Sequence, residues 1–157
     1  MAKEIERKFL VRGQEWRSLV EDRIRIRQFY LASSPGRSVR LRISNDRVAT
    51  LTLKFGSRGR ERDEFEYEVP LDDAREMQDQ AVGRVIEKTR HHVSHRGYLY
   101  EVDVFSGDLS GLVIAELETP DDVPAAELPA WLGREVTGDP RYYNASLALG
   151  DAPEAVA

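Results

Sequence analysis

The chain has 157 residues, of which 41% are hydrophobic and 32% are charged, and its formal net charge is −5. This length and hydrophobic content suit one compact domain, while the acidic balance argues against a general nucleic-acid binder, whose affinity would come from a basic surface. The absence of cysteine excludes disulfide bonds and thiolate metal sites, and it fits a reducing compartment.

The sequence carries no sign of export or membrane insertion. Its N-terminus has no apolar leader segment, and no run of about 18 apolar residues occurs. We therefore expect a soluble, cytoplasmic protein that contacts no membrane. A single domain is expected over residues 1–150, followed by a flexible tail at 151–157.

Alternation of apolar and polar residues predicts eight strands along the chain. In order, they are expected at 4–11, 24–31, 38–44, 48–54, 62–69, 85–94, 97–105 and 112–119. The spacing of apolar residues predicts four short helices, at 15–22, 72–82, 124–132 and 142–149. So many strands with so few helices indicate a mainly β fold of the α+β class, built on an antiparallel sheet.

One face of these strands is unusually ionic. Because side chains alternate between the two faces of a strand, Glu4, Glu6 and Lys8 share one face, opposite the apolar Ile5 and Phe9. The repetition of this pattern argues for a shared function of the face rather than for ordinary solvation. The later strands place the following residues on it: Arg40, Arg42, Lys54, Arg62, Glu64, Glu66, Lys88, Arg90, Asp103, Glu116 and Glu118.

The charges on this face are sorted by sign. On a strand face that is only exposed to solvent, positive and negative side chains should be mixed, because like charges two residues apart repel each other. Here the sequence has two carboxylate pairs and two basic pairs: Glu4/Glu6, Glu116/Glu118, Arg40/Arg42 and Lys88/Arg90. A divalent ion such as Mg2+ or Mn2+ would offset the repulsion between the carboxylates, and phosphate oxygens would bind the paired bases. If the sheet closes, acids on one wall and bases on the other would bind a metal-complexed polyanion.

The stretch Glu4-Ile5-Glu6-Arg7-Lys8 resembles the E-x-E-x-K signature of the CYTH superfamily, the triphosphate tunnel metalloenzymes. The resemblance continues in the order of the family through residues 28–31, 39–42, 52–54, 62–66, 87–90, 101–105, 115–118 and 135–139. It covers nearly the whole chain up to Leu149. It implies an eight-stranded antiparallel closed β-barrel, the triphosphate tunnel, with a few outer helices, and a metal-dependent hydrolysis or cyclisation of triphosphates.

The resemblance also implies roles for individual residues. The metal-binding acidic end would consist of Glu4, Glu6, Glu116 and Glu118. The phosphate cradle would consist of Lys8, Arg40, Arg42, Lys54, Arg62, Lys88 and Arg90. The expected catalytic residues are Glu64 and Glu66, which serve a second metal or position water in the family, Asp103 of the same acidic cluster, and Tyr30, which matches a tyrosine considered as a proton acceptor.

Three functions stay open at this point. The first is an inorganic tripolyphosphatase, a phosphoanhydride hydrolase, favoured because the short chain has no obvious segment for recognising a base. The second is a thiamine triphosphatase or class IV adenylyl cyclase of the same superfamily, which needs contacts for an organic group. The third is a non-catalytic polyphosphate-binding module, against which the retention of both carboxylate pairs argues. The expected partners are a small-molecule triphosphate and, as is common in the family, a second copy of the chain in a homodimer, with no nucleic acid.

Overall fold

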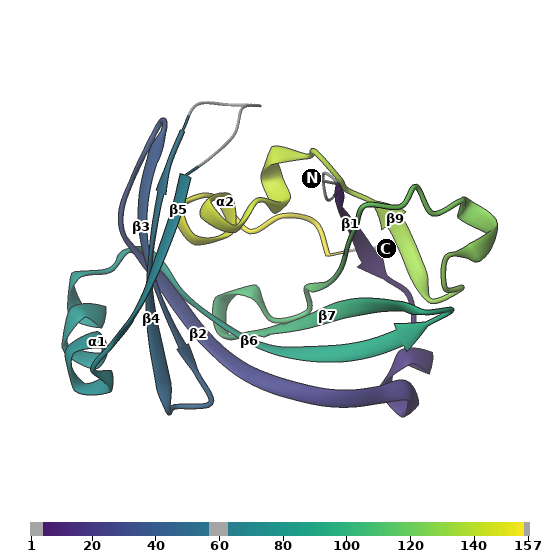
Figure 1. The fold of residues 1–157 in the computed structure, drawn as a ribbon, viewed down its shortest axis with the longest axis horizontal. Helices are drawn as coiled ribbons and strands as arrows, with labels where there is room; N and C mark the ends of the chain where they lie inside the picture. The colour runs from purple at the N-terminus through teal and green to yellow at the C-terminus, as the bar shows by residue number, and fades with distance from the viewer. Residues whose placement is uncertain (1–4, 57–62, 156–157) are drawn as a thin grey trace.

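The structure, a computed structural model, describes residues 5–56 and 63–155. It is mainly β with few helices, as expected (Figure 1). Its strands are β1 (Ile5–Val11), β2 (Val20–Ser34), β3 (Arg37–Ser44), β4 (Val48–Phe55), β5 (Asp63–Val69), β6 (Val82–His95), β7 (Tyr98–Ser106), β8 (Val113–Thr119) and β9 (Leu132–Glu135). The helices are α1 (Leu71–Met77) and α2 (Asn144–Leu149), with 3-10 turns η1 (Glu15–Leu19), η2 (Gln78–Gln80), η3 (Gly107–Leu109), η4 (Ala125–Glu127) and η5 (Pro140–Tyr142).

The strands of the described residues form one antiparallel sheet in the order β5-β4-β3-β2-β6-β7-β8-β1-β9. The expectation of a closed eight-stranded barrel is therefore wrong: the sheet has nine strands, and its ends, β5 and β9, are not paired with each other in the described part of the chain. Alternation in a sequence tells which residues share a face, but it does not tell whether the two outermost strands meet.

The ninth strand was not predicted from the sequence; it begins at Leu132, where the predicted helix at 124–132 was expected to end. Only a three-residue 3-10 turn, η4, forms within the predicted helix at 124–132, and β9 follows it and pairs with β1. The predicted helix at 15–22 is also shorter, because η1 ends at Leu19 and Val20 already pairs with Val93 of β6. Backbone pairing with a distant strand thus outweighs local helical spacing at both places.

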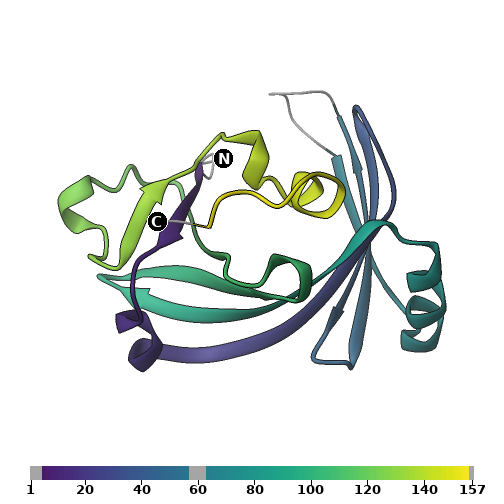
Figure 2. The same cartoon turned by 180° about the vertical axis from the view of Figure 1, so that it is seen from behind.

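The other two predicted helices are present. The first is α1, which ends at Met77 and continues as η2, and the second is α2. Figures 1 and 2 show α1 and α2 on opposite sides of the β3-β4-β5 part of the sheet. No helix in the described residues is long and apolar enough to cross a membrane.

Three buried clusters hold these elements together. Beneath α1, Phe29 and Leu41 pack with Ala74 on one face of the sheet. A second cluster, which includes Trp16 and Trp131, covers β1, β7 and β8. The third cluster docks α2 onto the face that also carries the charges, through contacts of its residues with Tyr30, Leu10, Ile86, Phe105 and others. The ionic face is therefore partly apolar, and the C-terminal helix occupies that apolar part.

The start of β6 fixes the position of α2. Arg84 donates from Nη1 to the carbonyl oxygens of Leu147, at 2.6 Å, and Gly150, at 2.9 Å. Gly83 has a φ of +76°, and a Cβ atom built at this position would lie 2.4 Å from the carbonyl oxygen of Ala148. Glycine is therefore required here both by the backbone conformation and by the close approach of the helix.

Candidate active site

Strand pairing places the predicted basic residues in adjacent rows on one face of the sheet. Arg40 lies between Thr52 of β4 and Tyr30 of β2, and Arg42 lies in the next row opposite Gln28. The rows continue through β6 and β7, where Lys88 pairs with Phe105 and Arg90 pairs with Asp103. Period-two alternation thus brings the predicted bases of β3 and β6 to one side, although the barrel is open.

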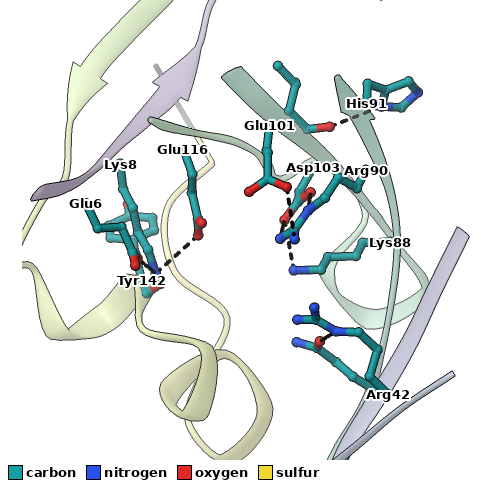
Figure 3. A network of polar contacts seen from close by, with 12 residues as sticks. Glu6, Lys8, Arg42, Lys88, Arg90, His91, Glu101, Asp103, Glu116 and Tyr142 are labelled. Carbon is teal, nitrogen blue, oxygen red and sulfur yellow. Dashed lines mark hydrogen bonds and ion pairs between the residues drawn. The ribbon is translucent and has the colours of Figure 1, made fainter. Parts of the chain in front are cut away.

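The centre of the site is the buried carboxylate of Asp103, a residue with 2% of its surface exposed. Arg90 donates to it twice, from Nε to Oδ1 at 2.9 Å and from Nη2 to Oδ2 at 3.0 Å. The Lys88 Nζ lies 2.8 Å from the same Oδ2 (Figure 3). Burial alone would raise the pKa of Asp103, but the Lys88 ammonium and the Arg90 guanidinium hold it at about 2.

Like charges crowd around this ion-pair cluster. Burial, followed by the positive charges of Arg40 and Arg90, lowers the pKa of Arg42 to about 10. Burial also lowers the pKa of Lys88, which Arg90 and Arg42 lower further against the opposing effect of Asp103. The Arg40 Nε is buried and has no hydrogen-bond partner among the described residues. The cluster therefore carries positive charge and donor capacity that its own carboxylates do not satisfy.

Two acidic residues, one on β1 and one on β8, lie near Lys8. Glu6 pairs with Glu118, and Lys8 pairs with Glu116 in the next row. The Lys8 Nζ lies 3.6 Å from Glu116 Oε1 and 3.9 Å from Glu6 Oε1. It also donates to the carbonyl oxygen of Tyr142, at 3.2 Å. Figure 3 shows these side chains directed toward the ion-pair cluster of β6 and β7 from the other side of the site.

Glu116 is the carboxylate whose surroundings favour the protonated form. Burial raises its pKa, and the nearby Glu6 and Asp103 raise it further, while Lys8 acts in the opposite direction. A cation placed among these carboxylates would offset their repulsion. Within residues 5–56 and 63–155, however, no three His, Asp or Glu side chains are grouped so that they could hold a metal ion. Glu4, the fourth predicted metal ligand, lies outside the described residues, as does the predicted phosphate ligand Arg62.

The remaining predicted residues lie further from this centre. Lys54 and Tyr30 line a cavity of about 830 Å³ that also reaches Glu6 and Lys8. Three predicted acids are exposed: Glu118 on β8, and Glu64 and Glu66 on the edge strand β5, where they pair with Lys54 and Thr52. The structure thus brings together the following predicted residues: Lys8, Arg42, Lys88, Arg90, Asp103 and Glu116.

Two groups of the site were not recognised in the sequence. Gln28 is 1% exposed and accepts a hydrogen bond from Arg42 Nε at 3.0 Å, so it orients that guanidinium. Alternation along its own strand contains no signal for this role, because its neighbours of the same parity, Ile26 and Tyr30, are uncharged. Tyr142 accepts a hydrogen bond from Lys8 through its main-chain carbonyl oxygen. Because every residue type has this group, the sequence contains no signal for the contact.

Comparisons with known proteins show the family of the chain. Residues 2–145 match the CYTH domain. The inorganic triphosphatase of Acetivibrio thermocellus is 45% identical over 148 residues, which cover 94% of each chain. The inorganic triphosphatase of Nitrosomonas europaea is 36% identical over 149 residues, which cover 93% of this chain and 97% of that one. The crystal structure of the inorganic triphosphatase NE1496 superimposes with a TM-score of 0.73 at 33% identity and covers 98% of this chain and 99% of that one. The chain belongs to the CYTH domain family.

Proposed function

We propose that this protein is an inorganic triphosphatase, an enzyme that hydrolyses a phosphoanhydride bond of tripolyphosphate. The observation that carries the proposal is the excess of buried positive charge around Asp103, where Lys88 and Arg90 contact the carboxylate and Arg42, which is influenced by Arg40, adds further positive charge. Such a cluster is costly unless an anion accompanies it. The choice of inorganic triphosphate is supported by the two relatives that bear this name and align over nearly the whole chain.

The basic residues are suited to hold the phosphates. Guanidinium groups bind phosphate oxygens through two parallel hydrogen bonds, and lysine supplies a point charge. Among the described residues, Arg40 Nε has no hydrogen-bond partner and Arg42 donates to Gln28 through Nε, so we assign the outer nitrogens of both guanidinium groups to such contacts. By spreading the negative charge of the non-transferred phosphates, these residues would stabilise the transition state, each contact being worth on the order of a few kcal/mol.

A divalent cation, Mg2+ or Mn2+, is proposed at the acidic side, held by Glu4, Glu6, Glu116 and Glu118. The chemistry of the donor set fits, because hard divalent ions prefer carboxylate oxygens, and Glu6 and Glu118 face each other across β1 and β8. When bound, the ion polarises phosphoryl oxygens and reduces charge repulsion. Lys8 already supplies one positive charge to Glu116 and Glu6.

The attacking water needs a group that orients it. We assign this role to Glu64 and Glu66, which share the face of the site with their partners Lys54 and Thr52. Tyr30 is buried and lines the cavity that Lys8 and Glu6 also line, and we assign to its phenol a contact with a bound phosphate. Positioning and electrostatics, rather than covalent chemistry, would supply most of the rate enhancement.

Phosphate release from tripolyphosphate tests the proposal, measured with Mg2+, with Mn2+ and with excess chelator. We expect turnover that the chelator abolishes. Glu6→Gln should remove this metal-dependent turnover and leave the melting temperature unchanged, while Glu76→Gln on α1 should behave like the wild type. Normal phosphate release by Glu6→Gln would contradict the proposed metal site, and absence of any turnover by the wild type would contradict the function.

A second candidate function has one observation in its favour. The cavity of about 830 Å³ has aromatic side chains in its wall, among them Phe55 and Tyr143, and the Tyr143 ring centre is 6.0 Å from Lys8 Nζ. These rings are suited to contact the organic group of thiamine triphosphate or ATP. Turnover of thiamine triphosphate and of ATP should be measured in parallel with turnover of tripolyphosphate. Faster turnover of either organic triphosphate would favour this second function.

Three expectations from the sequence and from the family resemblance stay predictions. They are the cytoplasmic location, the homodimer and the flexible tail at 151–157. Sedimentation of the purified protein over a range of concentrations measures the oligomeric state directly.

A further inference from the structure

Both carboxylate oxygens of Asp103 are bound by cationic side chains of the protein itself. Its Oδ1 accepts from Arg90 Nε, and its Oδ2 accepts from Arg90 Nη2 and lies 2.8 Å from Lys88 Nζ. The side chain is 3% exposed, and that of Lys88 is 1% exposed. Both oxygens are therefore bound to cations of the chain in a place from which water is excluded.

This occupancy is poorly suited to metal binding or to proton abstraction. A metal ion at Asp103 would have to displace Lys88 or Arg90, leaving a buried cation without a partner, which is strongly unfavourable. A general base works best when its pKa is near the pH of the reaction, and the pKa of Asp103 is held at about 2. Neither argument applies to Glu116, because its side chain is partly exposed and burial raises its pKa.

The contacts instead define the directions in which the two cations can point. The double hydrogen bond from Arg90 fixes the plane of its guanidinium, and the Nη1 of the same group lies 3.4 Å from Glu101 on β7. Lys88 is held on the other side of the same carboxylate. Without Asp103, these like charges would be buried beside Arg42 with no shared counterion, and flexible side chains would move apart.

We propose that Asp103 is a positioning residue, which holds Lys88 and Arg90 in one fixed arrangement for the phosphates and neither binds the metal nor takes a proton from water. The inference rests on the proposed triphosphatase function. It assigns Asp103 a different role from the catalytic one that the family resemblance implies, because the carboxylate acts through its two cationic neighbours.

The test is Asp103→Asn, assayed for tripolyphosphate turnover over a range of metal concentrations. The asparagine amide presents a donor where Asp103 has an acceptor, so one cation loses its partner. We expect kcat to fall by about 100-fold, as for a misplacement of about 1 Å, with the metal concentration at half-maximal rate unchanged within about twofold. A rise of about tenfold or more in that metal concentration would identify Asp103 as a metal ligand and overturn the inference.

A second readout does not depend on activity. In excess chelator, tripolyphosphate should raise the melting temperature of Asp103→Asn by more than it raises that of the wild type, because the added anion replaces the missing counterion. An equal or smaller rise would contradict the inference. If Asp103→Asn does not fold, the double variant Asp103→Asn/Lys88→Met should fold again, since it removes the unpaired cation together with the carboxylate; a double variant that stays unfolded would contradict the inference.

Glu87→Gln is the matched control. Glu87 precedes Lys88 on β6 but points to the other face, where it lies 3.6 Å from Arg27. Its removal changes the net charge by the same amount and should leave kcat, metal dependence and melting temperature close to wild type. If the wild type hydrolyses no tripolyphosphate, the proposed function fails, whereas a normal wild type with a metal-dependent defect in Asp103→Asn contradicts only the role given to Asp103.

Discussion

The contact between Gly83 and the C-terminal helix allows a quantitative prediction for Gly83→Ala. Gly83 and Gly97 both have a positive φ, of +76° and +82°, in which an alanine is strained. This strain costs about 1–2 kcal/mol and is partly offset by the smaller entropy of the unfolded chain. We therefore expect Gly97→Ala, whose Cβ would meet no atom of the described residues within 4 Å, to lose about 1 kcal/mol of unfolding free energy.

Gly83→Ala carries an additional steric cost. Its methyl group would lie 2.4 Å from the carbonyl oxygen of Ala148 and 2.8 Å from Leu149 Cδ2, so the last turn of α2 must move. That turn buries Leu147, which is 2% exposed, and loss of its burial costs about 2 kcal/mol. The expected total for Gly83→Ala is thus about 3 kcal/mol.

Thermal unfolding followed by tryptophan fluorescence separates the two variants. For a chain of this size, about 1 kcal/mol shifts the melting temperature by about 2–4 °C. Gly97→Ala should therefore melt about 2–4 °C below the wild type, and Gly83→Ala should melt about 6–12 °C below it. Melting temperatures of the two variants that agree within about 2 °C would refute the argument that helix docking, rather than backbone strain, requires Gly83.

Two further predictions concern ion pairs. Because the pKa of Asp103 is lowered from 3.8 to about 2, its carboxylate stabilises the fold above its ordinary pKa, and this stabilisation is lost as the pH falls through about 2. The difference in unfolding free energy between wild type and Asp103→Asn should therefore shrink by about 2 kcal/mol between about pH 5 and pH 2 in urea titrations, and a constant difference would contradict this. Arg7 binds Glu135 through two hydrogen bonds, of 2.9 and 2.8 Å, and Arg7→Lys keeps the charge but loses the second bond. It should cost about 1 kcal/mol, seen as a melting temperature about 2–4 °C lower, and an unchanged melting curve would show that charge alone suffices.

The sequence was sufficient to place three central residues on the ionic face. Lys88, Arg90 and Asp103 were placed on it by alternation alone, and they meet in the structure within hydrogen-bonding distance. This succeeded because a strand presents every second side chain to the same side whether the sheet is open or closed. The assignment of the face therefore did not depend on the incorrect barrel.

Alternation could not predict how deeply each residue of that face is buried. Glu66 and Asp103 occur in similar alternating segments, yet Glu66 is exposed and Asp103 is 2% exposed. The difference comes from strand order: β5 is an edge of the sheet, whereas β7 has β6 and β8 on its two sides. Strand order depends on pairing between segments far apart in the chain, and local alternation contains no information about it.

The position of β1 in the sheet has a consequence for how the protein is made. Both neighbours of β1 come late in the sequence, since β8 begins at Val113 and β9 at Leu132. At a synthesis rate of about 5–20 residues per second, β1 waits roughly 5–20 s for its first partner. During this time Phe9 and Leu10, which are buried in the folded protein, have no native contacts with β8 and are available to chaperones. The strand that carries Glu6 and Lys8 is therefore synthesised long before β8, so the acidic side of the site can form only after the chain has been made as far as Thr119.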